Sequence, residues 1–282
     1  KISKNYSFFY NNPWRNKFSR RYSIDNKINF VTNEIKKTDT VLEIGCGLGT
    51  LSYAIARKGS KITGIDISKK SIKYCNFHKK KYLNNRNNLI FKNTSLEEIL
   101  NDHKNYCFDK VIFFKTLHHI TNLSLNLKKI KKIMNKNSKL IIVEPLRKNF
   151  KIENAIFAFL LRLLSDTWIP KSRKFKQIKN SNLSKEIKNI YDEYKYISNN
   201  KKQQSPLDNI SDDFKKIKKY LNLNYTIKKI IFDDAVKDKI IGGIRGPYYK
   251  ETMEFINKFD NYLIKKKILT GSTVKIVAEL KK

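Results

Sequence analysis

The sequence predicts an α/β domain built on a doubly wound, mostly parallel sheet. Between Phe30 and Glu144, short apolar runs alternate with segments of helical periodicity. The runs are rich in Ile and Val and lack polar alternation, which is typical of strands buried on both faces of a parallel sheet. A glycine-rich turn joins the first run to the helix after it. This alternation favours parallel strands joined by helical crossovers.

The expected elements follow in chain order. The first helix after the turn spans Leu51–Lys58 and ends at Gly59, a residue suited to a helix C-terminus. Ser68 is expected to cap a helix that begins near Lys69, and Leu123–Met134 carries apolar residues at helical spacing. The predicted strands among these helices are Val41–Ile44, Lys61–Ile65, Leu89–Phe91, Lys110–Phe114 and Leu140–Val143.

The pattern changes after Pro145, where helical segments dominate until two further strands appear. The helices are expected at Asn154–Leu164, Asp212–Leu223 and Tyr248–Lys267, and the strands at Ile227–Phe232 and Thr273–Leu280. These strands complete a seven-stranded sheet with an antiparallel edge strand. We therefore divide the chain into an N-terminal arm (1–30), an α/β core (31–146), a mostly helical lid insertion (147–224) and C-terminal elements that complete the sheet (225–282).

Composition limits the classes of partner. The 282 residues carry a net charge of +35, which suggests a nucleic-acid or anionic-membrane partner. However, only nine of the 60 basic residues are Arg, and the chain is rich in Lys, Asn and Ile, which A/T-rich codons specify. Nucleic acid is therefore not the favoured partner. No apolar run reaches the ~20 residues of a membrane span. Three scattered cysteines favour a reducing cytoplasm and predict no metal site.

The segment Val41–Thr50 is the most informative in the chain. A buried strand runs into Gly45, Gly47 and Gly49, and a helix begins directly afterwards. Glycine lets the backbone turn sharply and approach a ligand closely. The G-x-G-x-G spacing differs from the G-x-G-x-x-G that binds a dinucleotide pyrophosphate. The loop therefore indicates a nucleotide-like ligand and disfavours a nicotinamide dehydrogenase.

Two acidic residues refine the ligand. Glu43 lies two residues before the first glycine, where a carboxylate repels phosphate but suits a cationic amino-acid group. Asp66 ends the second strand, 21 residues after Gly45, where an acid can accept both hydroxyls of a ribose. S-adenosylmethionine has a ribose and a cationic amino-acid group but no phosphate. The combination therefore predicts S-adenosylmethionine as the cofactor.

These segments resemble the successive motifs of the class I S-adenosylmethionine-dependent methyltransferases, which have a Rossmann-like fold. The matching segments are Val41–Thr50, Asp66, Phe91–Ile99 and Phe108–Ile120, within Phe30–Leu146. The resemblance is closest to the small-molecule group in which a Leu-His-His-Ile-like segment follows the fourth strand. It implies that the three glycines pack against the cofactor, that Glu43 faces its amino-acid end and that Asp66 and Ile67 hold the ribose.

One position departs from the family. Where the family often has an acid that contacts the adenine amine, this chain has Ser95, whose hydroxyl can still accept a hydrogen bond. The backbone of Leu96 can still meet the ring. The complete predicted cofactor site comprises Glu43, Gly45, Cys46, Gly47, Gly49, Asp66, Ile67, Ser95, Leu96 and Lys115.

Catalytic candidates follow the fourth strand, because ligands of open α/β sheets lie at the carboxyl ends of the strands. His118 or His119 is a candidate general base, since imidazole titrates near neutral pH. The alternative is that one histidine packs under the cofactor and the other caps or lines the next helix. Glu144, after the fifth strand, is either a carboxylate of the acceptor site or a structural partner near the end of the strand. No Asn/Asp-Pro-Pro-Tyr segment is present, which disfavours methylation of the amino groups of adenine or glutamine.

Two segments are expected to select the acceptor. The aromatic segment Phe8–Trp14 either closes over the cofactor or packs on the core. In the insertion, the apolar run Ala155–Leu164 forms a buried lid helix or, as part of residues 154–168, rests on a membrane surface.

The leading hypothesis is a cytoplasmic methyltransferase, with peripheral membrane contact as an alternative location. Its expected acceptor is a sugar, lipid or quinone-like small molecule, methylated on oxygen, nitrogen or carbon. The alternatives are an RNA methyltransferase, which the basic charge favours, and a non-catalytic protein that binds S-adenosylmethionine for regulation.

Overall fold

A computed structural model describes residues 16–82, 87–102, 104, 106–167, 171–180, 182–195 and 213–281. The aromatic segment Phe8–Trp14 lies outside these residues. The chain divides into two compact units. The core unit comprises Ile28–Pro145, Gln203–Ile231 and Val274–Lys282, and the helical unit comprises Lys1–Lys27, Leu146–Lys202 and Phe232–Thr273.

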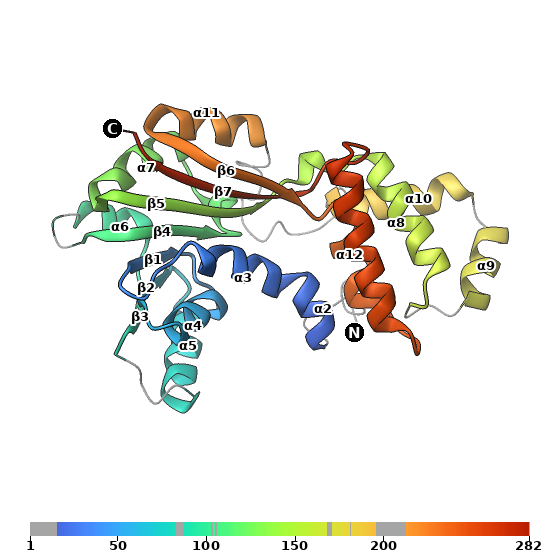
Figure 1. Ribbon diagram of the computed structural model, residues 1–282, viewed down its shortest axis with the longest axis horizontal. Coiled ribbons are helices and arrows are strands. Elements are labelled where there is room, and N and C mark those ends of the chain that lie inside the picture. The colour runs from blue at the N-terminus through green and yellow to red at the C-terminus, as the bar shows by residue number, and fades with distance from the viewer. Residues whose placement is uncertain are drawn as a thin grey trace. The chain divides into compact units, whose positions relative to one another are not determined.

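The core unit is built on a seven-stranded sheet with the order β3-β2-β1-β4-β5-β7-β6 (Figure 1). Every pairing from β3 to β5 is parallel. The order reverses between β1 and β4, and open α/β sheets bind ligands at such a switch point. The strands are β1 (Thr40–Ile44), β2 (Lys61–Asp66), β3 (Leu89–Asn93), β4 (Phe108–Phe114), β5 (Met134–Pro145), β6 (Tyr225–Asp233) and β7 (Thr273–Leu280).

Strand β7 runs antiparallel to both of its neighbours. The Ser272 amide, just before β7, donates to the carbonyl of Asp234, just after β6, and the Lys281 amide donates to Asn224, just before β6. The Leu146 amide, just after β5, donates to the carbonyl of Ser272. The predicted sheet, mostly parallel with an antiparallel strand at this edge, is confirmed, and β6 is its outermost strand.

The helices of the core unit begin where the sequence supplies caps. Ser68 accepts from the Ser71 amide at 3.2 Å at the start of α5, and Ser95 accepts from the Glu98 amide at 3.2 Å at the start of α6. Helices α7 and α11 pack against each other. The helices with residues in this unit are α3 (Ile24–Asn33), α4 (Thr50–Arg57), α5 (Lys69–Tyr82), α6 (Leu96–Asn101), α7 (Leu123–Ile130) and α11 (Phe214–Asn224).

The prediction of one helix over Leu123–Met134 was wrong at its C-terminal end. The α-helix ends at Ile130, a short 3₁₀ turn covers Lys131–Ile133, and β5 begins at Met134. Met134 is buried and pairs with Phe108 of β4. Tertiary pairing thus extends the strand into a segment whose spacing of apolar residues is also helical.

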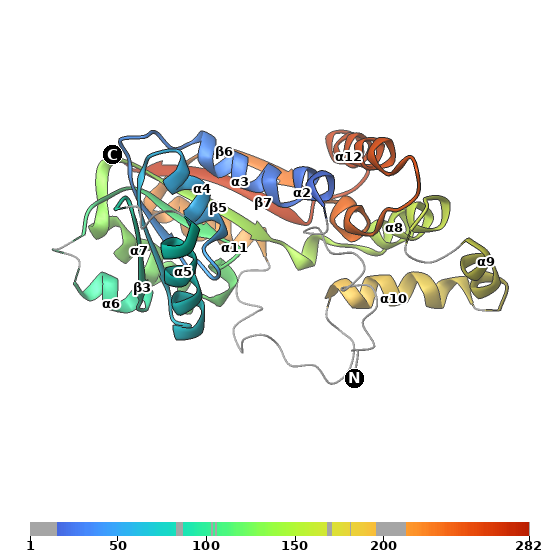
Figure 2. The ribbon, with the colours of Figure 1, turned by 90° about the horizontal axis from the view of Figure 1, so that it is seen from below.

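The helical unit surrounds an apolar core of its own. Phe150, Ala155, Ala158, Leu161 and Met253 are among the residues buried in this core, and α8 packs along α10. Figure 2 shows these helices from a second direction. The helices of this unit are α2 (Lys17–Tyr22), α8 (Ile152–Leu164), α9 (Lys171–Asn180), α10 (Leu183–Lys195) and α12 (Tyr249–Lys265). Among the described residues, no helix is long and apolar enough to cross a bilayer.

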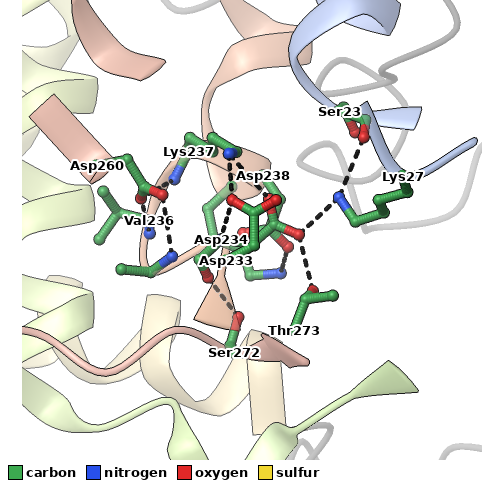
Figure 3. A network of polar contacts seen from close by, with 12 residues as sticks. Ser23, Lys27, Asp233, Asp234, Val236, Lys237, Asp238, Asp260, Ser272 and Thr273 are labelled. Atoms are coloured by element: carbon green, nitrogen blue, oxygen red, sulfur yellow. Dashed lines mark hydrogen bonds and ion pairs between the residues drawn. The ribbon is translucent and has the colours of Figure 1, made fainter. Parts of the chain in front are cut away.

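A buried ionic network links distant segments of the helical unit (Figure 3). Lys27 contacts Asp234 at 2.6 Å, and Lys237 contacts both Asp233 and Asp234. Asp260 accepts from the amides of Val236 at 2.6 Å and Lys237 at 2.9 Å. Although burial alone would raise the pKa of Asp234, the two ammonium groups hold it well below its usual range. Burial raises the pKa of Asp260 to about 6, against the opposing effect of Lys237.

Candidate functional site

The glycine loop after β1 has a left-handed backbone at three positions. The φ angles of Gly45, Gly47 and Gly49 are +69°, +52° and +77°, a region in which residues with a Cβ are strained. A Cβ on Gly45 would lie 2.2 Å from the Cγ2 of Thr116, and one on Gly49 would lie 2.9 Å from the ring of Phe91. A Cβ on Gly47 would meet nothing within 4 Å. The first and third glycines therefore permit close packing, whereas the second faces open space.

Asp66 holds this loop in place. Its Oδ2 accepts from the Gly47 amide at 2.9 Å, and its Oδ1 accepts from the Ser68 amide at 2.8 Å. The Ile65 carbonyl, at the end of β2, accepts from the amides of Gly45 and Cys46. The next residue along, Ile67, is exposed. The structure thus brings together the acid and the glycine loop that the sequence predicted as parts of one site.

Two thiols lie close to the glycine loop, and nothing in the sequence indicated that they would be neighbours. The Cys75 thiol, from α5, donates to the Gly47 carbonyl at 3.3 Å, and the Cys46 thiol lies 4.0 Å from the same oxygen. Both cysteines are buried. A hydrogen bond from the Cys46 thiol lowers the pKa of Cys75, even though burial opposes this shift. Both thiols therefore contact the backbone of the loop at the Gly47 carbonyl.

Glu43 is buried on β1 and accepts a hydrogen bond from the hydroxyl of Ser52, on α4. Sequence reasoning did not identify Ser52, which lies one helical turn beyond the loop. Burial raises the pKa of Glu43 to about 8, although the Ser52 hydrogen bond opposes this shift. In the protein without ligand, this carboxyl group is therefore mostly protonated at neutral pH. A cationic group beside it would favour its ionised form.

The raised pKa of Glu43 predicts a pH-dependent loss of stability. A carboxyl group whose pKa is raised on folding contributes its full share of folding stability below its unfolded pKa, near 4.5. That stability is lost as pH rises through the folded-state pKa of about 8. We expect the melting temperature of the ligand-free wild type to fall over this range more steeply than that of Glu43→Gln, which cannot ionise. Differential scanning calorimetry across the range tests this, and parallel pH profiles for the two proteins would contradict it.

The predicted adenine contacts lie at the start of α6. The Ser95 hydroxyl accepts from the Glu98 amide and lies 3.1 Å from the Glu98 carboxylate. The same carboxylate accepts from the Ser95 amide at 2.7 Å, which completes a capping box. Leu96 is buried in the first turn of this helix. The Ser95 side chain thus caps α6, and its contact with adenine stays a prediction.

The segment after β4 carries the catalytic candidates. Lys115 is exposed, with a φ of +58°, and its amide donates to the Val143 carbonyl at 2.7 Å. Thr116 donates its hydroxyl to the Gly45 carbonyl at 3.2 Å, so the segment lies directly against the glycine loop. A 3₁₀ turn over Leu117–His119 follows. The sequence did not single out Thr116 as the residue that touches the loop.

His118 and Glu144 form a buried pair. The Nδ1 of His118 lies within hydrogen-bond distance of the Glu144 carboxylate, which also accepts from the amides of Leu117 at 3.1 Å and His118 at 3.2 Å. Burial raises the pKa of Glu144, against the opposing effect of His118. The ring centroids of His118 and His119 lie 4.0 Å apart. The Glu144 carboxylate, the His118 imidazole and the glycine loop therefore lie together at the carboxyl ends of β1, β4 and β5.

Comparison with known proteins places this site in context. The methyltransferase domain family matches residues 35–212, which is more than half of the chain. The ubiquinone biosynthesis O-methyltransferase of Pelagibacter ubique is 32% identical over 134 residues, which cover 48% of this chain and 52% of that protein. The N-methyltransferase 4 of Papaver somniferum is 32% identical over 120 residues, which cover 42% and 33%. The matches thus span about half or less of these relatives.

The fold also resembles a solved structure. The crystal structure of the MccD protein has a TM-score of 0.50 to this chain at 14% identity, covering 90% of this chain and 96% of that one. At this level of identity the likeness concerns the fold alone.

Proposed function

The chain belongs to the methyltransferase domain family, within the class I S-adenosylmethionine-dependent enzymes, and from this premise we propose that it methylates a hydroxyl group of a small molecule. The cofactor part of the proposal rests on the glycine loop, in which Gly47 faces open space while Asp66 accepts from its amide, and the hydroxyl acceptor rests on the buried pair of His118 and Glu144. Relatives named O-methyltransferases of ubiquinone biosynthesis support a small acceptor. Sugars, lipids and quinone-like rings belong to this class of acceptor, and a ring hydroxyl is the one we favour.

The residues around the loop fit S-adenosylmethionine. The backbone at Gly47 would lie against the ligand, Asp66 and Ile67 would hold its ribose, and Glu43 would lie nearest its amino-acid group. When bound, the cofactor would supply an electrophilic methyl group on a sulfonium, whose sulfur would leave as a neutral thioether when an acceptor oxygen attacks the methyl carbon. Little covalent chemistry is then left for the protein, whose main contribution is alignment.

The remaining task is removal of the acceptor proton. Because Glu144 accepts at Nδ1 of His118, it favours the tautomer whose Nε2 carries the lone pair. In the proposed step the hydroxyl oxygen would bond to the methyl carbon as the bond from that carbon to sulfur breaks, and the hydroxyl proton would pass to Nε2 of His118. Glu144 acts through His118 and is therefore a positioning residue.

The decisive experiment combines binding and transfer. Calorimetric titration with S-adenosylmethionine, its demethylated product and NADH should show saturable binding of the first two only. Transfer of a radiolabelled methyl group should then be measured to dihydroxybenzenes and to RNA in parallel. Transfer of the label to RNA but not to the dihydroxybenzenes would favour the RNA alternative. In that case the binding of RNA would depend steeply on salt concentration. Binding without transfer to any acceptor would favour a regulatory role.

Replacement of His118 separates its two possible roles. We expect His118→Gln to lower kcat by about 10²–10⁴-fold, the range typical of a lost general base, with unchanged affinity for S-adenosylmethionine. His119→Gln is the matched control and should retain most of the activity. If His118→Gln lowers the melting temperature but leaves kcat intact, His118 has a structural role only.

A further inference from the structure

Helix α8 exposes an apolar stripe along its whole length. Ile152, Ile156, Leu160 and Leu164, spaced four residues apart, are 44%, 37%, 43% and 70% exposed. The opposite side of the helix, with Ala155, Ala158 and Leu161, is buried in the core of the helical unit. A surface helix ordinarily has one apolar face and one polar face, so apolar residues on both sides indicate a second apolar contact.

Charged groups are almost absent from the exposed side of α8. Its one basic residue, Arg162, is directed inward, where it donates to the Lys239 carbonyl at 3.0 Å and lies 3.6 Å from Glu193. Glu153 is the other charged residue among the 13 residues of this helix, all of which the structure describes, and it is exposed. Apart from Glu153, the exposed residues of α8 are therefore all apolar.

Helix α9 adds basic and aromatic side chains at the C-terminal end of the stripe. Lys174 donates to the Ser165 carbonyl at 2.6 Å, and Lys171 contacts Asp166 at 3.1 Å, so the start of α9 is attached to the end of α8. Phe175 is exposed on α9 and is accompanied by the exposed Lys176 and Lys179. An exposed aromatic ring among lysines is a composition suited to an anionic lipid interface.

The length of α8 determines whether it can span a bilayer or can only lie along its surface. The 13 residues of α8 extend about 20 Å at 1.5 Å per residue, whereas a membrane span needs about 30 Å. The helix can therefore lie in the plane of the interface, with its stripe among the acyl chains and the lysines of α9 at the level of the headgroups.

We propose that the exposed stripe of α8, together with Phe175, Lys176 and Lys179 of α9, docks on the anionic phospholipid surface of a bilayer. The apolar side chains supply most of the affinity, and the lysines select anionic lipid. The docking surface shares no residue with the predicted cofactor site, and the proposal does not depend on which acceptor is methylated.

Co-sedimentation of the full chain with phospholipid vesicles tests this surface. We expect binding to vesicles of phosphatidylcholine mixed with phosphatidylglycerol, weaker binding to phosphatidylcholine alone, and release by added salt. Leu160→Ser/Leu164→Ser should bind on the order of 100-fold more weakly, because each buried leucine contributes roughly a factor of ten or more. The matched control is Leu125→Ser/Leu223→Ser, which replaces leucines 49% and 59% exposed on α7 and α11 and should bind like the wild type.

Several outcomes would overturn the proposal. These are failure of the wild type to bind anionic vesicles, equal losses in the two double variants, and indifference to lipid charge. Sedimentation velocity without vesicles provides a further arm, since a wild-type dimer that Leu160→Ser/Leu164→Ser dissociates, without vesicle binding, would assign the stripe to a second copy. If circular dichroism shows that this variant does not fold, Lys176→Glu/Lys179→Glu provides the test. We expect this second variant to lose its preference for anionic vesicles, and unchanged binding to them would contradict the proposal.

Discussion

Gly47→Arg is expected to abolish binding of S-adenosylmethionine while the protein stays folded. The Cβ position of Gly47 has no neighbour within 4 Å, so a side chain there starts without a clash and enters the space proposed for the ligand. The left-handed φ of +52° adds a strain of about 1–2 kcal/mol, which a folded domain usually tolerates. Calorimetric titration should show at least a 100-fold loss of affinity, and circular dichroism should show native secondary structure.

Two other glycines serve as controls for this result. Gly59→Arg introduces the same side chain at another left-handed position, at the end of α4, with only ordinary contacts to Lys37, so it should retain binding. Gly45→Ala forces a methyl group against Thr116 and should instead lower the free energy of unfolding by about 2–5 kcal/mol, from strain and overpacking together. Normal binding by folded Gly47→Arg would contradict the proposed cofactor position.

Lys237→Met is expected to lower the free energy of unfolding by about 3–5 kcal/mol, the usual cost of removing one partner from a buried ion pair. Lys237 is fully buried and contacts Asp233 and Asp234. Without its ammonium group, Lys27 is the remaining cation of this network for Asp233, Asp234 and Asp260. Urea denaturation near neutral pH, followed by circular dichroism, measures the loss.

The pH dependence of this loss has a definite sign. Because folding lowers the pKa of Asp234, its ionised carboxylate contributes folding stability above the unfolded-state pKa, near 3.8. This stability is lost as pH falls towards the folded-state pKa. Removal of Lys237 weakens that contribution, so the difference between variant and wild type should be largest near neutral pH and shrink in acid. Lys258→Met, which breaks the exposed pair with Glu254, is the control and should leave stability unchanged. Equal stability of Lys237→Met and the wild type would contradict a supporting role for the network.

Local pattern in the sequence was enough to predict most of the sheet and the loop at its centre. The run Val41–Ile44 became part of β1, which is buried along nearly its whole length between two parallel neighbours. The run Lys61–Ile65 became part of β2, in which Lys61 is exposed while Ile62 and Ile65 are buried. The glycine spacing and Asp66 could be related because both lie at the carboxyl ends of adjacent parallel strands. These features depend on short-range periodicity and on a few residues whose backbone requirements are strict.

Contacts between distant residues were decided by the tertiary structure alone. His118 and Glu144 were separate candidates in the sequence, and they meet only because β4 and β5 are neighbours in register. The close approach of Gly45 to Thr116, the start of β5 at Met134 and the network around Lys237 have the same origin. In each case the deciding energy is packing or charge pairing across the fold, which is specified by three-dimensional neighbours and leaves no periodic trace in the chain.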